Sequence, residues 1–572
     1  MLKSQQVRSL SPEMDPLRMG MGWTVDDLSK PQIMVESTYG NSHPGSGHLN
    51  IFVEEAVRGV NDHGGKAARY FATDMCDGMA QGHDGINYSL AHREAITNLV
   101  EAQANATTFD GGVFISSCDK AMPAMLPVTV AIAACTYACG RAMQRHKTAA
   151  LRVGVIGLLV ILAFFKYNGA FAADGGWQAV AMPLGISFYS FAAISYLIDA
   201  ARGDCEVETN FIDCVLYLNF FATITQGPIC RAGALLPQFK EEHRFDAART
   251  VCALRLMALG LFKLVAVSDV LGLLVDEVFP NYRSYGGPML ILAAIFYTFQ
   301  LYFNFSGYSE VARAVGLLLG LNLPENFKTP FFATNFSGFW SRWHISFSSW
   351  LQDYLFMPLA WADVSGLTGG RIQRLPAEFC VFTVFFVSGF WHGNTLPFVI
   401  WGLLQACYRL GEELMHRRFG KPKKKAPAKT LWAKRAGVFV LWTISMVFFC
   451  VGMSGAGLTA GDAFAYLGGW FTGWSPARFG AELYGAAYNG FYANTIMVAA
   501  YYAFVVVTLA LGFALDARRA FTYKNKPSEI CLANEKHRWG IYYVLVICLL
   551  VGYIMQNGGF GGASGFGMYA NF

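Results

Sequence analysis

The stretch FCVFTVFFVSGFWHGNTLPFVIWGLLQACY, residues 379–408, contains no aspartate, glutamate, lysine or arginine. A helix that crosses a bilayer needs about 20 apolar residues to span about 30 Å of hydrocarbon. The first apolar run, Phe379–Trp391, reaches only about 20 Å at a rise of 1.5 Å per residue, and an apolar helix resumes at Leu396. The stretch therefore predicts a helix that breaks at His392-Gly393-Asn394, within the depth of a membrane. Such breaks are tolerated where they line a protein cavity.

His392 is the one histidine after residue 128 that lies within a long apolar stretch. Ionisable residues at membrane depth are costly, and this makes them candidates for function. Histidine has an ordinary pKa of about 6.5, so it can take a proton from a hydroxyl and later release it. An alcohol that attacks a thioester needs such a base. A histidine that only hydrogen-bonds to a backbone carbonyl is the competing interpretation, and the residue alone favours neither.

Further apolar segments extend this pattern over most of the chain. The complete set of candidate spans is Val128–Gly140, Val153–Phe171, Gln178–Asp199, Phe211–Ile229, Val251–Phe279, Pro288–Phe305, Phe379–Tyr408, Leu431–Met453, Thr495–Leu515 and Trp539–Met555. We expect a mainly α, multi-pass helical membrane protein.

The composition divides the chain into two parts. Of all residues 54% are hydrophobic and only 15% are charged, whereas soluble proteins carry about 25% charged residues. Residues 1–127 have a net charge of −6 and residues 128–572 a net charge of +11. In the first part, short apolar runs at Pro31–Glu36 and Gly112–Ser117 alternate with the helix-like Phe52–Val60. We therefore predict a truncated, soluble α/β segment over 1–127 and a membrane domain over 128–572.

Two basic segments lie between the predicted spans. One extends from Arg141 to Arg152, and the other from Arg417 to Arg435. Positive loops remain preferentially on the cytoplasmic side of a membrane, so we predict that both segments are cytoplasmic. Because the second lies between spans, a signal for topology is a better explanation for it than a nucleic-acid site.

Short motifs carry a family resemblance across the membrane part. In chain order they are Pro183-Leu184-Gly185-Ile186-Ser187-Phe188-Tyr189, Gln226-Gly227-Pro228-Ile229, Phe262-Lys263, Phe296–Ser309, Pro324-Glu325-Asn326-Phe327, Phe339–Ser346 and Ser388–Gly393. This order resembles the bacterial membrane-bound O-acyltransferases over about 128–572, above all the alginate O-acetyltransferase branch. Two positions depart from that branch: Asn304 replaces an aspartate, and Ala360–Asp363 replaces a Gly-Gly-Asn-Arg turn.

The resemblance implies transfer of an acyl group, acetyl in the alginate branch, to hydroxyls of an extracytoplasmic polysaccharide. The family's membrane histidine falls on His392, the expected general base, and its other motif histidine falls on His344, an expected supporting residue. The implied partners are the lipid bilayer of a bacterial inner membrane and an acyl-CoA or acyl carrier protein as donor. The resemblance also implies that the polysaccharide acceptor is reached through periplasmic acetylation proteins and that acyl transfer requires no cofactor. A non-enzymatic transporter is the alternative, because transporters also contain broken helices.

Residues of about 14–126 resemble a different family, the dihydroxy-acid and sugar-acid dehydratases. The matching motifs are Lys30-Pro31-Gln32-Ile33, His43-Pro44-Gly45, Cys76-Asp77-Gly78, Gln81-Gly82-His83-Asp84-Gly85, Tyr88-Ser89-Leu90 and Ser117-Cys118-Asp119-Lys120. The resemblance implies that Cys118 would bind an iron–sulfur cluster. It implies that Asp77, Asp119 and a carbamylated Lys120 would bind magnesium, which agrees with the preference of iron for thiolates and magnesium for carboxylates.

The dehydratase motifs end near Leu126, where the membrane part begins. The family's further cluster cysteine and its catalytic serine region have no counterpart here. One thiolate cannot hold a cluster, so we expect these four residues to be vestigial and the dehydratase segment to be inactive. The junction indicates two joined coding regions, which a natural fusion, an assembly error or a gene-model error would each produce.

Overall fold

The computed structural model describes residues 2–40, 49–72, 99, 103, 109–115, 122–172, 185–368, 370, 372–420, 427–454, 457–490, 492, 494–524 and 538–556. The chain divides into two compact units, Met1–Val128 and Thr129–Phe572. A mainly helical membrane protein preceded by a small α/β segment, as predicted from the sequence, is confirmed.

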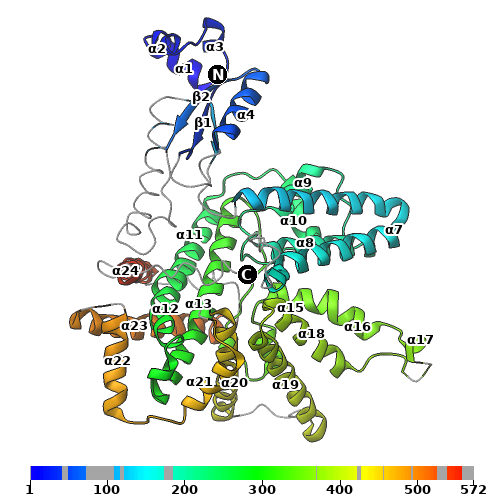
Figure 1. The fold of residues 1–572 in the computed structure, drawn as a ribbon, viewed down its shortest axis with the longest axis vertical. Coiled ribbons are helices and arrows are strands. Elements are labelled where there is room, and N and C mark those ends of the chain that lie inside the picture. Colours follow the sequence, from blue (N-terminus) through cyan, green and yellow to red (C-terminus); the bar gives the residue numbers. More distant parts are fainter. Residues whose placement is uncertain are drawn as a thin grey trace. The chain divides into compact units, whose positions relative to one another are not determined.

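The first unit is built around a parallel sheet (Figure 1). Its described elements are α1 (Lys3–Leu10), α2 (Met14–Gly20), α3 (Val25–Ser29), β1 (Gln32–Ser37), α4 (Leu49–Asp62), β2 (Lys66–Phe71) and β3 (Gly111–Ile115). The strand order is β2-β1-β3, and β1 pairs in parallel with both neighbours.

The central strand β1 is buried along most of its length, including its polar residues Gln32, Glu36 and Ser37. Met34 belongs to one apolar cluster together with Trp23 and Leu28. Its neighbour Val35 belongs to a second cluster with Val53 and Val57 of α4. Successive side chains of a strand point to opposite faces, so this alternation places the two clusters on opposite sides of the sheet.

The second unit is helical, and several of its helices can span a bilayer. Its elements are α7 (Met122–Ala172, which begins before the unit boundary), α8 (Ile186–Arg202), α9 (Phe211–Leu218), α10 (Ala232–Lys240), α11 (Ala247–Leu261), η2 (Phe262–Ser268), α12 (Asp269–Val278), η3 (Tyr282–Ser284), α13 (Gly287–Leu318), η4 (Pro330–Phe332), α14 (Phe336–Trp340), α15 (Ile345–Leu351), η5 (Gln352–Phe356), α16 (Met357–Trp361), α17 (Ser365–Thr368), α18 (Ala377–His392), α19 (Leu396–Phe419), α20 (Ala428–Met453), α21 (Ala460–Gly469), α22 (Pro476–Gly490), α23 (Thr495–Phe521) and α24 (Arg538–Gln556). Within the described ranges, six segments have the length and hydropathy of membrane spans: Ala131–Tyr167, Ala247–Val278, Gly287–Leu318, Ala428–Met453, Thr495–Phe521 and Arg538–Gln556.

The segment α7 reverses direction in its middle. His146 has non-helical backbone angles (φ −133°, ψ 65°). A Cβ atom on Gly154 would lie 3.2 Å from Cβ of Cys139, whereas 15 residues of straight helix would separate these positions by about 22 Å. The two predicted spans Val128–Gly140 and Val153–Phe171 therefore form the arms of a hairpin, with the basic segment at its tip.

The predicted span Phe211–Ile229 is wrong. Helix α9 ends at Leu218, after eight residues, which is too short to cross a bilayer. Asn219 follows it, and its side-chain amide donates a hydrogen bond to the carbonyl oxygen of Val215, a competition with the helix backbone that favours termination. The chain then turns through Gln226-Gly227-Pro228. The segment buries Leu218 and Phe220 but leaves Ile212 and Phe221 exposed.

Helices α18 and α19 form a tight hairpin whose tip is the predicted break (Figure 1). Helix α18 ends at His392, as the apolar run predicted. The two helices touch at Gly389 and Gly402, where a Cβ on Gly389 would lie 3.0 Å from Cα of Gly402. At the other end of the hairpin, Glu378 forms an ion pair with Arg417. Fourteen residues at 1.5 Å place His392 about 21 Å from that ion pair.

Helix α13 lies at the centre of the unit and packs against α11, α12 and α20. The buried residues of α13 lie on all sides of the helix, as expected for a helix enclosed by others. It also buries Glu310, whose Oε1 lies 2.8 Å from Nζ of Lys263 in the π-helical turn η2. The Phe262-Lys263 motif therefore fixes α13 to the neighbouring helix.

Candidate active site

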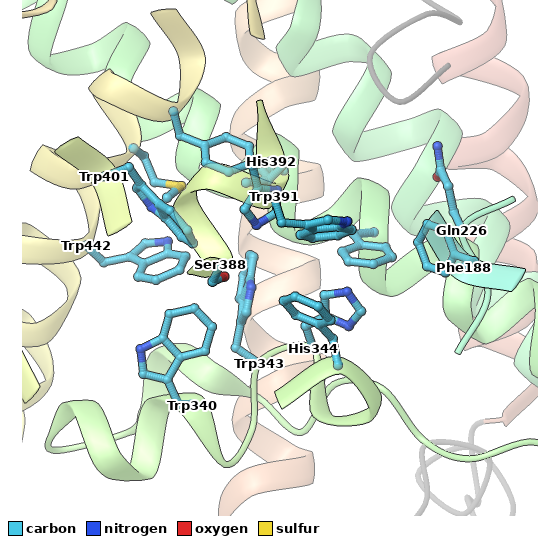
Figure 2. A pocket seen from close by; sticks show the side chains of 15 residues that line it. Phe188, Gln226, Trp340, Trp343, His344, Ser388, Trp391, His392, Trp401 and Trp442 are labelled. Carbon is cyan, nitrogen blue, oxygen red and sulfur yellow. The ribbon is translucent and has the colours of Figure 1, made fainter. Parts of the chain in front are cut away.

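A small, mostly apolar cavity lies where the motifs meet (Figure 2). Its volume is about 40 Å³, enough for two or three water molecules at roughly 10–15 Å³ each. Residues from five of the seven motifs line it. The lining consists of Phe188, Gln226, Leu301, Phe305, Trp340, Trp343, His344, Phe347, Ser388, Trp391, His392, Trp401, Trp442, Met446 and Phe449. We call it the histidine cavity because both predicted histidines line it.

His392 stands at the tip of the α18–α19 hairpin, inside a cage of aromatic rings. Its ring centroid lies 4.5 Å from that of Trp391, 4.9 Å from Phe449 and 5.0 Å from Trp401. Phe449 and Trp401 approach edge to face, a favourable geometry for aromatic pairs. The cage fixes the orientation of the imidazole, and a fixed orientation is what proton transfer in a small cavity requires.

His344 enters the same cavity from the turn between α14 and α15. Its backbone is left-handed (φ 45°, ψ 55°), a conformation that is uncommon for residues other than glycine and is found repeatedly at functional sites. The side chain is buried, and its ring packs against Phe305 at 4.6 Å and Phe347 at 5.0 Å. Phe347 also contacts the ring of His392, with centroids 6.4 Å apart, so one aromatic ring lies against both histidines.

Asn326, from the Pro324–Phe327 motif, fixes the orientation of His344. Its Oδ1 accepts a hydrogen bond from the backbone N–H of Ser346 (3.2 Å) and lies 3.1 Å from Nδ1 of His344. A backbone N–H can only donate, so the atom facing it is the amide oxygen. Nδ1 of His344 must then donate to the same oxygen, and the neutral ring keeps its lone pair on Nε2.

Replacing Asn326 by leucine is expected to destabilise the protein, because it removes the acceptor of buried donors in Ser346 and His344. Each donor left unpaired costs roughly 1–3 kcal/mol. The measurement is the free energy of unfolding of the purified protein in a detergent titration. Asn322→Leu, at an exposed position in the same loop, is the matched control and should change stability by less than about 0.5 kcal/mol. Equal stability of the two variants would contradict the anchoring role.

Several hydrogen-bond donors in the cavity wall have no partner among the residues that the structure describes. The hydroxyl of Ser388 and the indole N–H groups of Trp340, Trp401 and Trp442 are buried without a hydrogen bond. Unpaired buried donors are rare in folded proteins and call for an explanation. A bound carbonyl or a developing oxyanion would accept hydrogen bonds from them, as in other sites that stabilise negative charge during acyl transfer.

A buried charge network supports the wall that carries His344. Glu325 forms an ion pair with Arg519, and Arg519 also donates a hydrogen bond to the carbonyl oxygen of Phe327 (3.0 Å). Asp516, one turn earlier on α23, accepts a hydrogen bond from the hydroxyl of Tyr302 (2.7 Å). The Pro324–Phe327 motif is thereby held by charges from helix α23, about 190 residues away in sequence.

The residues predicted for the dehydratase chemistry, Asp77, Asp119, Lys120 and Cys118, lie outside the described residues. So do the motifs at residues 43–45, 76–78, 81–85 and 88–90. In the parts of the chain that the structure describes, no group of three or more His, Cys, Asp or Glu is arranged to hold a metal ion.

The sequence reasoning missed Ser388 and Lys166. Ser388 precedes His392 by one helical turn, so the two share a face of α18. That spacing was visible in the sequence. Lys166 is a lone cation within the apolar run of α7's second arm, and the rule that intramembrane charges indicate function would have identified it. No sequence pattern predicts that the indole N–H groups of Trp340, Trp401 and Trp442 lack hydrogen-bond partners among the described residues.

Comparison with known proteins gives two separate matches. Residues 205–457 match the family model of MBOAT, the membrane-bound O-acyltransferase family. Residues 30–174 match the model of the dihydroxy-acid/6-phosphogluconate dehydratase N-terminal domain. The second match extends beyond Leu126, where the recognisable motifs end.

Three curated relatives illustrate the range of the first match. The chain is 37% identical over 265 residues to the probable alginate O-acetylase AlgI of Pseudomonas syringae pv. tomato, covering 44% of this chain and 49% of that protein. It is 31% identical over 293 residues to the peptidoglycan O-acetyltransferase of Helicobacter pylori (45% and 54% covered). It is 29% identical over 297 residues to the teichoic acid D-alanyltransferase of Streptococcus thermophilus (48% and 69% covered).

The chain thus spans about half the length of the alginate and peptidoglycan acetyltransferases that it matches. The matched region nevertheless includes His344, Asn326 and His392, together with most of the wall of the histidine cavity. Residues 205–457 of this multi-pass membrane protein therefore form a domain of the membrane-bound O-acyltransferase family.

Proposed function

We propose that the protein transfers an acyl group, in the simplest case acetyl, from a thioester donor to a hydroxyl of an extracytoplasmic polysaccharide. The observation that carries the proposal is the position of His392 at a helix break, in an aromatic cavity that it shares with His344. The relatives support the class of acceptor, because their names specify alginate, peptidoglycan and teichoic acid. We place the protein in the bacterial inner membrane, with an acyl-CoA or acyl carrier protein as donor.

In the proposed reaction, His392 is the general base. Its imidazole takes the proton of the acceptor hydroxyl while the oxygen attacks the carbonyl carbon of the thioester, so that a C–O bond forms. The tetrahedral intermediate then expels the thiolate as the C–S bond breaks, and the imidazolium returns the proton to the sulfur. Ser388 and the indole N–H groups donate hydrogen bonds to the oxyanion in between. His344 orients the acceptor hydroxyl through the lone pair on Nε2.

The full chain, expressed in bacteria that lack their own polymer O-acetylation, is expected to add ester-linked acyl groups to a cell-envelope polymer. The measurement is the alkali-labile acetyl and D-alanyl content of purified polyuronate, peptidoglycan and teichoic acid. Cells with an empty vector provide the background. If the protein is present in the membrane fraction and none of the three polymers gains acyl groups, the proposal fails.

A further inference from the structure

A second cavity lies beside the histidine cavity and is not used by the proposed reaction. Its volume is about 350 Å³, within the range of roughly 300–1,000 Å³ that is typical of small-molecule sites. The second arm of α7 forms one wall, and α8, α15, η5 and α18 form the others. We call it the α7–α18 cavity. It shares only Phe347, Ser388 and Trp391 with the histidine cavity.

The α7 wall is a single apolar face of a helix that carries one cation. Val155, Leu159, Leu162 and Ala163 line the cavity at helical spacing, and Lys166 follows on the same face. The borders of the cavity include large apolar side chains that are exposed on the surface of the protein, such as Leu159 (47%) and Phe390 (44%). In a bilayer these residues face lipid chains, so the cavity is accessible to a lipid-like molecule.

The ammonium of Lys166 is buried in this wall without a hydrogen-bond partner among the described residues. It lies over the ring of Trp391, 4.7 Å from the centroid. A cation–π contact of this kind attracts the charge but leaves the three N–H donors of the ammonium unused. An unpaired charge in an apolar surrounding is costly, and binding an anion would remove the cost.

The neighbouring residue holds Lys166 in place. The hydroxyl of Tyr167 donates a hydrogen bond to the carbonyl oxygen of Phe390 (2.8 Å), and the two rings stack at 4.9 Å. Two consecutive residues of α7 are therefore paired with Phe390 and Trp391 of α18. These contacts hold this turn of α7 against α18, with the ammonium of Lys166 over the ring of Trp391.

Lys166 also lies too far along the helix to reach a membrane surface on the basic side. Fourteen residues separate it from Arg152 near the hairpin tip, or about 21 Å of helix, within a hydrocarbon layer of about 30 Å. Charges at such depth are retained for function and usually have a partner. No carboxylate fills that role among the described residues of the cavity wall.

We propose that the α7–α18 cavity binds an anionic amphiphile, whose carboxylate or phosphate pairs with Lys166 and whose aliphatic chain lies along the apolar face of α7. A sugar polymer would leave its hydroxyls unpaired against this wall, whereas an aliphatic chain matches it. The site goes beyond the proposed acyl transfer. Because Trp391 separates the two cavities, the bound amphiphile contacts the residue next to the proposed base.

The test uses the purified full chain in nanodiscs and a photoreactive dodecanoate as the probe. The label is expected on peptides of α7 or α18. Unlabelled dodecanoate and dodecyl phosphate should compete at least tenfold better than dodecanol, and the ratio of the two anions identifies the preferred headgroup. Inorganic phosphate alone should not compete. Lys166→Met should weaken competition by both anions at least tenfold and leave competition by dodecanol unchanged. Lys166→Arg should behave as the wild type does, with both anions competing more strongly than dodecanol.

Two controls separate this proposal from other failures. Ala163→Trp fills the cavity and should reduce labelling by every probe, while His392→Ala should leave labelling unchanged because it removes no wall of this cavity. The labelling result therefore does not depend on whether the protein transfers acyl groups. Labelling spread over all helices, competition by inorganic phosphate, or equal anion binding by wild type and Lys166→Met would overturn the proposal.

Discussion

His392→Ala is expected to lower acyl transfer by about 10²–10⁴-fold, the usual contribution of a general base, while the protein still inserts into the membrane. The imidazole contributes contacts with the rings around it, but the hairpin itself is held by backbone contact at Gly389 and Gly402. Loss of the ring therefore removes the base without removing the helix pair. The measurement is the acyl content of the polymer in cells that carry equal amounts of wild-type and variant protein.

His416→Ala provides the matched control for this prediction. His416 also lies in the last turn of an apolar helix, α19, but it does not line the histidine cavity. Its replacement should leave polymer acylation at the wild-type value. Unchanged acylation in the His392→Ala variant would show that the ring is structural, and a transporter with an incidental histidine would then become the better interpretation.

The second large effect is expected at Lys263, and it concerns folding rather than chemistry. The side chains of Lys263 and Glu310 are only 4% and 7% exposed, and Oε2 of Glu310 has no hydrogen-bond partner in the described part of the chain. Lys263→Met would leave a carboxylate buried between helices without its partner. Removal of one member of a buried ion pair costs about 3–5 kcal/mol, a large part of the stability of a typical domain.

The double variant Lys263→Met/Glu310→Leu distinguishes this mechanism from a simple loss of packing. It removes both charges, and replacement of a buried ion pair by apolar residues is often neutral or stabilising. We therefore expect the double variant to recover most of the unfolding free energy that the single variant loses. Arg244→Met, which breaks an exposed ion pair with Glu242, should have little effect. A double variant no more stable than Lys263→Met would contradict this explanation.

The sequence predicted the parts of the fold that depend on local pattern. Apolar length located the spans, and the break after Trp391 followed from the thirteen-residue run before it. The two arms of α7 were also predicted as separate spans. Phe211–Ile229 was mistaken for a span because hydropathy alone does not reveal that its helix stops after eight residues. Its helix ends at a polar residue, Asn219, whose effect was overlooked.

The candidate site was only partly accessible from sequence for a different reason. His392 and His344 are each conspicuous in their own segment, and both line the histidine cavity. The role of Asn326 depends on contacts across 18 residues to His344. The indole groups of Trp340 and Trp442 become candidates only because, in the folded chain, neither N–H has a hydrogen-bond partner among the described residues. Such facts belong to the three-dimensional arrangement, which no local pattern contains.

The glycine contact between α18 and α19 determines how a substrate can enter. A Cβ on Gly389 would stand only 2.6 Å from the carbonyl oxygen of Phe398 in α19. The two helices are therefore packed closely along this contact. A chamber of 40 Å³ cannot hold a thioester and a sugar together, so it has to enlarge. We expect aromatic rings of the lining, such as Phe449 and Trp401, to enlarge the cavity by rotating about their own side-chain bonds while the α18–α19 contact stays closed.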